Sequence, residues 1–167
     1  MSPEIVIRPA ETGDLAALGR LGAALVRTHH GFDAQRFMAP PPDVEGGYAW
    51  FLGTQLGLAD VVVLVAARGD AVLGYVYAGL EPESWKELRG PAGFIHDVVV
   101  DVDERGHGVA TRLLAAAAAW LEDRGAPRLM LWTAEHNVAA RRLFARLGFR
   151  ATMVEMTRER ADCDKSG

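Results

Sequence analysis

Residues 94–125 combine a short strand, a turn with two glycines and a long helix, and this order constrains the fold more than any other stretch. Residues 94–100 are an apolar, valine-rich run, the pattern of a buried strand. Gly106 and Gly108 lie in the turn that follows. Residues 109–124 are almost all good helix formers, and Gly125 supplies a stop signal before a nearby proline. The stretch therefore predicts a strand that feeds a helix through a tight turn.

This geometry is suited to binding a phosphate group. Backbone N–H groups and the positive end of the helix dipole converge on one small volume at the start of the helix. Gly106 and Gly108 lack a Cβ, so positive φ angles and a close approach of phosphate to the backbone both cost little. A purely structural turn explains the two glycines equally well. A Walker-type loop is excluded because its lysine is missing, and the Rossmann fingerprint is excluded because Thr111 occupies the place of its third glycine.

Two blocks of sequence resemble the GNAT superfamily of N-acetyltransferases. Arg105, Gly108 and Ala110 fill the acetyl-CoA signature Gln/Arg-x-x-Gly-x-Gly/Ala. Residues 131–137 and residues 147–149 are similar to the next strand, the Asn-led helix and the Gly-Phe entry to the last hairpin of that superfamily. The resemblance implies an α/β fold, a GNAT-type single domain with a central mixed β-sheet flanked by helices and splayed strands at the acetyl-CoA site.

The resemblance also implies that acetyl-CoA is the cosubstrate and that no metal takes part. The strand backbone would pair with the pantetheine arm, and the glycine turn would wrap the pyrophosphate. The superfamily usually has Lys or Arg where His107 stands, so Arg105 and Arg142 are expected to supply the positive charge. The residues expected to contact acetyl-CoA are Val98, Val99, Val100, Arg105, Gly106, His107, Gly108, Val109, Ala110, Thr111, Asn137 and Phe144.

Three side chains are candidates for catalysis, namely His96, Asp97 and Glu135. Residues 95–97 resemble the Leu-Glu-Asp of the spermidine/spermine (diamine) acetyltransferase branch, in which the glutamate is the proposed base, and His96 takes that position. A strand histidine held by a backbone hydrogen bond is an equally good interpretation. Adjacent strand residues face opposite sides, so at most one of His96 and Asp97 is expected to point into the site. Asp97 is interpreted as structural or substrate-orienting, and Glu135 as a second carboxylate or as a solvated loop charge.

One departure from the superfamily concerns the leaving group. Phe144 stands where the resemblance places a tyrosine that protonates the departing sulfur. Tyr75 and Tyr77 share a strand face and offer substitutes, although core packing also explains them. The sequence thus leaves two functions open. One is an active N-acetyltransferase, and the alternative is a non-catalytic acyl-CoA-binding module.

The amine acceptor is predicted only as a class. The carboxylates of Glu81, Glu83, Glu87, Asp97 and Glu135 would form an acidic mouth suited to a polyamine-like or aminoglycoside-like amine, or to a peptide amine. Acidic residues scattered on loops serve solubility just as well. Trp50 and Trp85 either shape the acceptor pocket or anchor the loops in which they lie.

The rest of the chain supplies the remaining elements of one domain. We predict a domain over residues 1–158, a polar tail over residues 159–167, and a homodimer, because an apolar last strand would otherwise leave an open sheet edge. The expected elements are strands over 4–9, 61–66, 72–78, 128–133 and 149–157 and helices over 15–29, 48–58 and 137–147.

Composition limits the compartment and the partners. The net charge is −4 and the pI is near 5.7, so binding to nucleic acid has no electrostatic support. The longest apolar stretch is far shorter than the ~20 residues of a membrane helix, so no membrane partner is expected. The start of the chain lacks signal-peptide features, and Cys163 is the only cysteine. We therefore expect a cytoplasmic location.

Overall fold

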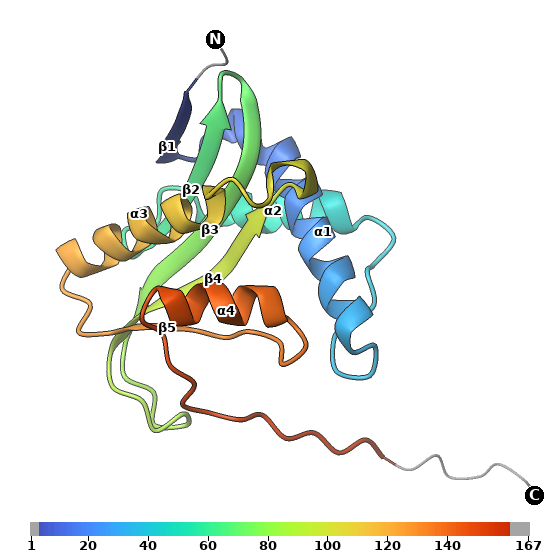
Figure 1. Cartoon of the computed structure of the whole chain (residues 1–167), viewed down its shortest axis with the longest axis vertical. Helices are drawn as coiled ribbons and strands as arrows, with labels where there is room; N and C mark the ends of the chain where they lie inside the picture. Colours follow the sequence, from blue (N-terminus) through green and yellow to red (C-terminus); the bar gives the residue numbers. More distant parts are fainter. Residues whose placement is uncertain (1–3, 161–167) are drawn as a thin grey trace, which may run out of the picture.

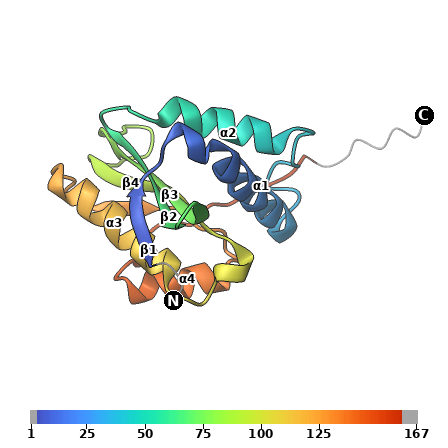
Figure 2. The ribbon, with the colours of Figure 1, turned by 90° about the horizontal axis from the view of Figure 1, so that it is seen from above.

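The computed structural model describes residues 4–160, which fold into three layers with a β-sheet in the middle (Figure 2). Helices α1 and α2 cover one face of the sheet, and α3 and α4 cover the other. The α/β fold class is confirmed. The elements in chain order are β1 Ile5–Pro9, α1 Leu15–Phe32, α2 Val44–Gln55, β2 Val61–Arg68, β3 Ala71–Glu81, β4 Ala92–Val100, α3 Val109–Asp123, β5 Leu129–Leu131 and α4 Val138–Arg146, with short 3-10 helices at Thr12–Asp14 and Val102–Glu104.

The sheet is mixed, with strand order β1-β2-β3-β4-β5. The first four strands form antiparallel pairs, and β5 alone pairs in parallel, with β4. That last pairing covers only residues 93–95 of β4. β5 ends at Leu131 and the chain after it runs away from β4 (Figure 1), so within residues 4–160 no strand lies beside His96 to Val100 on that side of β4. The predicted splay is present at this point.

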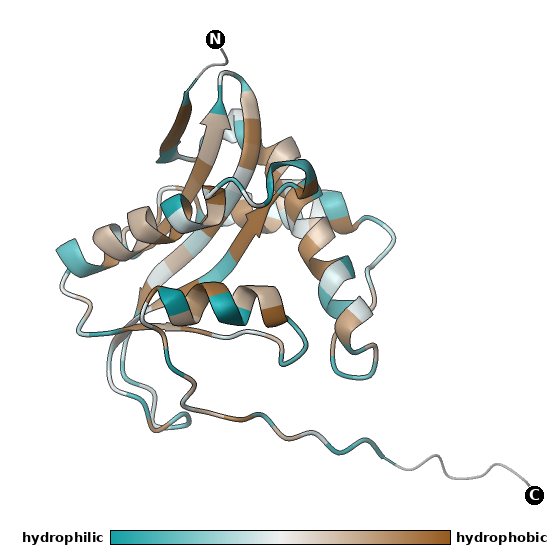
Figure 3. Cartoon of the chain, in the orientation of Figure 1, coloured by the Kyte–Doolittle hydropathy of each residue, from teal (hydrophilic) through white to brown (hydrophobic). Residues whose placement is uncertain are grey.

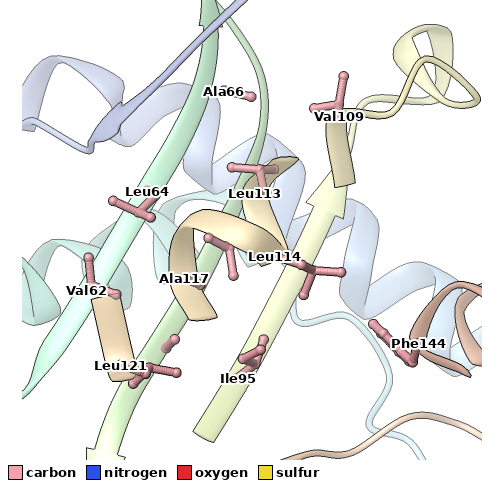
Figure 4. Close-up of a cluster of buried hydrophobic side chains, with 12 residues drawn as sticks. Val62, Leu64, Ala66, Ile95, Val109, Leu113, Leu114, Ala117, Leu121 and Phe144 are labelled. Atoms are coloured by element: carbon pink, nitrogen blue, oxygen red, sulfur yellow. The ribbon is translucent and has the colours of Figure 1, made fainter. Parts of the chain in front are cut away.

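Helix α3 is held on the sheet by one apolar face. Leu113, Ala117 and Leu121 are fully buried and recur at four-residue steps, as the inward stripe of a helix requires. They pack with Val62, Ile95 and other strand residues in a core cluster to which Phe144 also belongs (Figure 4). This packing fixes the start of α3 beside the end of β4. The glycine turn between the two elements is thereby held in place.

The largest differences from the sequence-based expectations concern the start of α2 and the end of the chain. Helix α2 begins four residues earlier than predicted, at Val44, because the side chain of Asp43 caps it by accepting a hydrogen bond from the Gly46 N–H. The predicted strand over 149–157 is wrong. Residues 150–160 are extended and exposed and form no strand within the described chain (Figure 1). Arg36 and Glu155 form an ion pair, which joins this segment to the loop after α1.

Other expectations for the two ends of the chain fall partly outside the described residues. Positions 161–167 of the predicted polar tail, with Cys163, lie beyond residue 160. Across residues 4–160, no helix combines the length and the hydropathy needed to cross a membrane.

Candidate active site

A β-bulge in β4 places His96 and Asp97 on the same face of the sheet. Opposite β3, Tyr77 pairs with Asp97 while the next residue pairs with Ile95, so His96 is the extra residue. Ile95 and Val98 consequently both pack toward α3, with two residues between them instead of one. The expectation that His96 and Asp97 face opposite sides of the sheet is therefore wrong. Figure 3 shows a hydrophilic break within β4, which is otherwise largely hydrophobic.

Asp97 accepts hydrogen bonds from two tyrosines, one in α2 and one in β3. The hydroxyl of Tyr48, from α2, donates to Asp97 Oδ2 at 2.6 Å, and that of Tyr75, from β3, donates to the same oxygen at 3.0 Å. Burial raises the pKa of Asp97, although the two hydroxyl hydrogen bonds act to lower it. Burial and the nearby carboxylate raise the pKa values of both tyrosines, so both remain protonated donors. Asp97 therefore connects α2 to the sheet at the residue that follows His96.

His96 lies between two aromatic rings and beside a carboxylate. Its ring stacks on Tyr77 at a centroid distance of 4.8 Å and on Phe94 at 5.0 Å. His96 Nε2 lies 3.3 Å from Glu81 Oε1. Burial lowers the pKa of His96, and the charges of Glu81 and Asp97 oppose that shift. The imidazole is thus mainly neutral near pH 7 and can accept a proton.

Glu81 is a site residue whose contact with His96 the sequence does not reveal. It ends β3, and its Oε2 accepts a hydrogen bond from Arg89 Nη2 at 2.8 Å. The Nε of Arg89 also donates to Glu87 at 2.8 Å, and the Arg89 side chain is only 7% exposed. This ion-pair group fixes the loop after β3 against the sheet. The contact between Glu81 and His96 depends on the register of β3 against β4, and the spacing of residues along the sequence does not predict that register.

The structure does not bring Glu135 together with His96 and Asp97. Glu135 is exposed in the loop after β5, where its backbone carbonyl accepts a hydrogen bond from Arg141 Nη1 at 3.2 Å. No contact joins its carboxylate to the other two candidates within the described residues.

The turn between β4 and α3 presents unpaired backbone donors. Gly106 and Gly108 both have φ angles of 78°, in the left-handed region that favours glycine. A Cβ at either position would meet no protein atom within 4 Å, so close packing does not require these glycines. Among the described residues nothing accepts a hydrogen bond from the N–H groups of residues 106–108, and the first turn of α3 adds further free donors. Arg105 Nε donates to the Val100 carbonyl at 3.3 Å, which holds the turn against β4, and His107 is exposed.

Two other residues predicted to contact acetyl-CoA, Asn137 and Phe144, contact other parts of the protein. The side chain of Asn137 caps α4 by accepting a hydrogen bond from the Ala140 N–H at 3.2 Å. Phe144 is buried in the α3-side core and packs edge-on against Phe149. Of the two tyrosines considered as substitutes for the missing acid, Tyr75 is fully buried on Asp97. The hydroxyl of Tyr77 donates to Gln55 Oε1 at 3.2 Å on the His96 side of the sheet.

Asp97→Asn tests whether burial of this carboxyl opposes folding near neutral pH. Because the folded pKa is raised, the stability that Asp97 contributes is fully present below its unfolded pKa, ~3.9, and is lost as the pH rises through the folded value. Asparagine still accepts the tyrosine hydrogen bonds but does not titrate. We expect the free energy of unfolding of the variant, relative to wild type, to rise between pH ~4 and pH ~8. Urea denaturation across that range measures it.

Asp14→Asn is the matched control, because its expected sign is opposite. The hydrogen bond from Arg8, at 2.8 Å, lowers the pKa of Asp14, so its stabilising effect is present above the unfolded pKa and is lost as the pH falls. The relative stability of that variant should fall with rising pH. If both variants changed in the same direction, the account of Asp97 would be wrong.

Comparison with known proteins identifies a family and relatives that match most of the chain. The model of the acetyltransferase (GNAT) family matches residues 27–149. The chain is 30% identical over 146 residues to the uncharacterized N-acetyltransferase YhfO of Bacillus subtilis, which covers 86% of this chain and 88% of that protein. It is 34% identical over 92 residues to a mycothiol acetyltransferase of Thermobispora bispora, across 55% of this chain and 31% of that protein. The chain thus spans less than a third of that longer relative.

A solved structure shares the fold. The aminoglycoside N-acetyltransferase AAC(6')-Iy, in complex with CoA, superposes with a TM-score of 0.73 at 18% identity, over 96% of this chain and 98% of that one. None of the proteins named here is described as a spermidine/spermine acetyltransferase, so the resemblance to that branch stays a prediction.

Proposed function

This chain belongs to the acetyltransferase (GNAT) family, and on that premise we propose that it transfers the acetyl group of acetyl-CoA to a primary amine of a small molecule or peptide. The observation that carries the proposal is the placement of His96 on β4, whose edge no strand of the described chain pairs from residue 96 onward and whose end leads into a glycine turn with free backbone donors. One strand, β4, thereby carries a proton acceptor and leads to a turn that can bind the phosphates of a nucleotide thioester.

Acetyl-CoA is proposed to bind along β4 and the following turn. Its pantetheine amides would pair with the free backbone edge of residues 98–100, which no strand of the described chain occupies on that side. Its pyrophosphate would be bound by the N–H groups of residues 105–111, where the two glycines leave open space above the backbone. When bound, acetyl-CoA supplies the activated acetyl thioester.

His96 is proposed to be the general base. The carboxylate of Glu81 beside Nε2 favours the tautomer with the proton on that nitrogen, which leaves the lone pair on Nδ1. Nδ1 takes a proton from the acceptor ammonium. The amine nitrogen then forms a C–N bond to the acetyl carbon, and the C–S bond breaks with its electron pair on sulfur. The second nitrogen proton is lost to water.

The CoA thiolate is proposed to leave without a dedicated acid. Phe144 is buried and carries no proton, and Tyr75 is committed to Asp97. A thiolate leaves readily near neutral pH, so the missing acid would cost only about 10²-fold in rate, at the low end for acid catalysis.

Acetyl-CoA turnover with a panel of amines tests this function. We expect free CoA thiol to appear only when an accepted amine is present, together with a product whose mass has increased by one acetyl group. Tight binding of acetyl-CoA without any acetylated product would contradict the proposal and favour the non-catalytic acyl-CoA-binding module, which Phe144 makes the second candidate.

We also propose a homodimer. Residues 153–156 expose the apolar side chains of Met153, Val154 and Met156, and the outer edge of β5 pairs with no strand of the described chain. A second copy is the partner that would cover both features, which otherwise favour edge-to-edge association. Light scattering at micromolar concentration should give twice the mass of the 18.0 kDa chain. A mass of one chain would contradict the dimer.

A further inference from the structure

A continuous row of aromatic rings runs across the sheet face on which His96 lies. Neighbouring rings are 4.8 to 5.9 Å apart between centroids, and the row passes from α2 over β3 and β4 to the loop after β5. We call it the ring row, and its members in spatial order are Tyr48, Phe51, Tyr77, His96, Phe94 and Trp132. His96 occupies its middle, so the proposed base is surrounded by aromatic surface.

Much of the ring row is accessible from outside. Trp132 at one end is 73% exposed, and Phe51 near the other end is 36% exposed. Between them, the His96 side chain is 29% exposed and Tyr77 is half-buried. Phe94 is buried and Tyr48 is half-buried, and both support this surface from below. A flat apolar group therefore has rings to contact on both sides of His96.

The acidic side chains around the ring row are largely neutralised. Glu81 and Glu87 both pair with Arg89, so two carboxylates and one guanidinium leave one net negative charge beside His96. Asp97 is half-buried and accepts hydrogen bonds from two hydroxyls, and desolvation raises its pKa. Glu135 makes no contact with this group within the described residues. Of the five carboxylates of the predicted acidic mouth, only that of Glu81 contacts His96 within the described residues, so the mouth is not assembled around this residue.

We propose that the acceptor is a primary monoamine carried on an aromatic or other flat apolar body. Its ring would stack along the ring row, and its nitrogen would lie at His96, where the single net negative charge and the faces of the tyrosine and tryptophan rings attract one ammonium. A polyamine or an aminoglycoside carries several charges, and each needs a carboxylate that is free to pair. This inference rests on the proposed acetyl transfer and specifies its substrate class.

The test compares four acceptors in the acetyl-CoA assay with thiol detection, namely 2-phenylethylamine, spermidine, kanamycin and an alanine-led tripeptide. We expect kcat/KM for 2-phenylethylamine to exceed each of the others at least tenfold. Trp132→Ala should lower kcat/KM for 2-phenylethylamine about fivefold, mainly through KM, because one stacking partner is lost. Trp50→Ala is the matched control, since Trp50 is 72% exposed and belongs to no ring pair in the described chain.

The possible results distinguish failure of the substrate-class inference from failure of the proposed function. Preference for spermidine, kanamycin or the tripeptide would overturn this inference and leave the acetyl-transfer proposal standing. An equal effect of Trp132→Ala and Trp50→Ala on KM would also overturn it. Acetyl-CoA binding by calorimetry with no thiol release from any of the four amines would overturn the proposed function itself.

Discussion

His96→Ala is expected to lower the turnover of amine acetylation at least ~10²-fold while leaving the affinity for acetyl-CoA unchanged. A general base acts on the chemical step, and His96 faces the α1 and α2 side of the sheet, away from the proposed pyrophosphate turn. Steady-state kinetics with an accepted amine measures turnover, and calorimetry measures the dissociation constant for acetyl-CoA.

Two controls separate the role of His96 from a general loss of folding. His136→Ala removes an exposed histidine of the loop before α4 and should leave turnover unchanged. Glu135→Gln should do the same, because this carboxylate contacts neither His96 nor Asp97 within the described residues. Wild-type turnover in His96→Ala together with loss of activity in Glu135→Gln would assign the base to Glu135 instead.

Gly108→Trp is expected to weaken acetyl-CoA binding at least ~10-fold, because each lost hydrogen bond to a charged phosphate is worth more than a factor of ten. The indole would fill the open space above the turn and separate the phosphates from the N–H groups of residues 106–108. Gly108 also has a φ of 78°, so the substitution strains the backbone by ~1–2 kcal/mol in addition. Calorimetry with acetyl-CoA measures the affinity.

Gly57→Trp isolates the effect of that strain. Gly57 has a φ of 81° and open space around its Cβ position, as Gly108 does, but it lies in the turn after α2. We expect both variants to lose similar stability in urea denaturation and only Gly108→Trp to lose acetyl-CoA affinity. Undiminished affinity in Gly108→Trp would remove the turn from the proposed cosubstrate site.

The parts of the fold that the sequence predicted well are those controlled by local chemistry. The valine-rich run, the two glycines and the alanine-rich helix each have a strong local preference, so β4, the turn and α3 formed close to the predicted residues. Strands β2 and β3 likewise followed from the valine-rich and aromatic runs predicted as strands over 61–66 and 72–78. In these elements local preference and tertiary packing agree.

The parts that sequence reasoning missed depend on pairing between distant residues. The bulge at His96 is a property of the β3–β4 register, and a one-residue change in register reverses the direction of every later side chain. The contact of Glu81 with His96 follows from the same register. The predicted last strand has suitable residues, but a strand needs a neighbouring strand, and residues 150–160 lie beside none within the described chain.

The pH dependence of kcat/KM at saturating acetyl-CoA tests the role of His96 most directly. A base must be deprotonated to act, so the rate should rise with pH through one step, and burial places that step below the ordinary histidine pKa of ~6.5. Since the charge of Glu81 raises the pKa of His96, Glu81→Gln should move the step to lower pH, and His96→Ala should abolish it. A step that keeps its position in Glu81→Gln and persists in His96→Ala would contradict the assignment of His96 as the base.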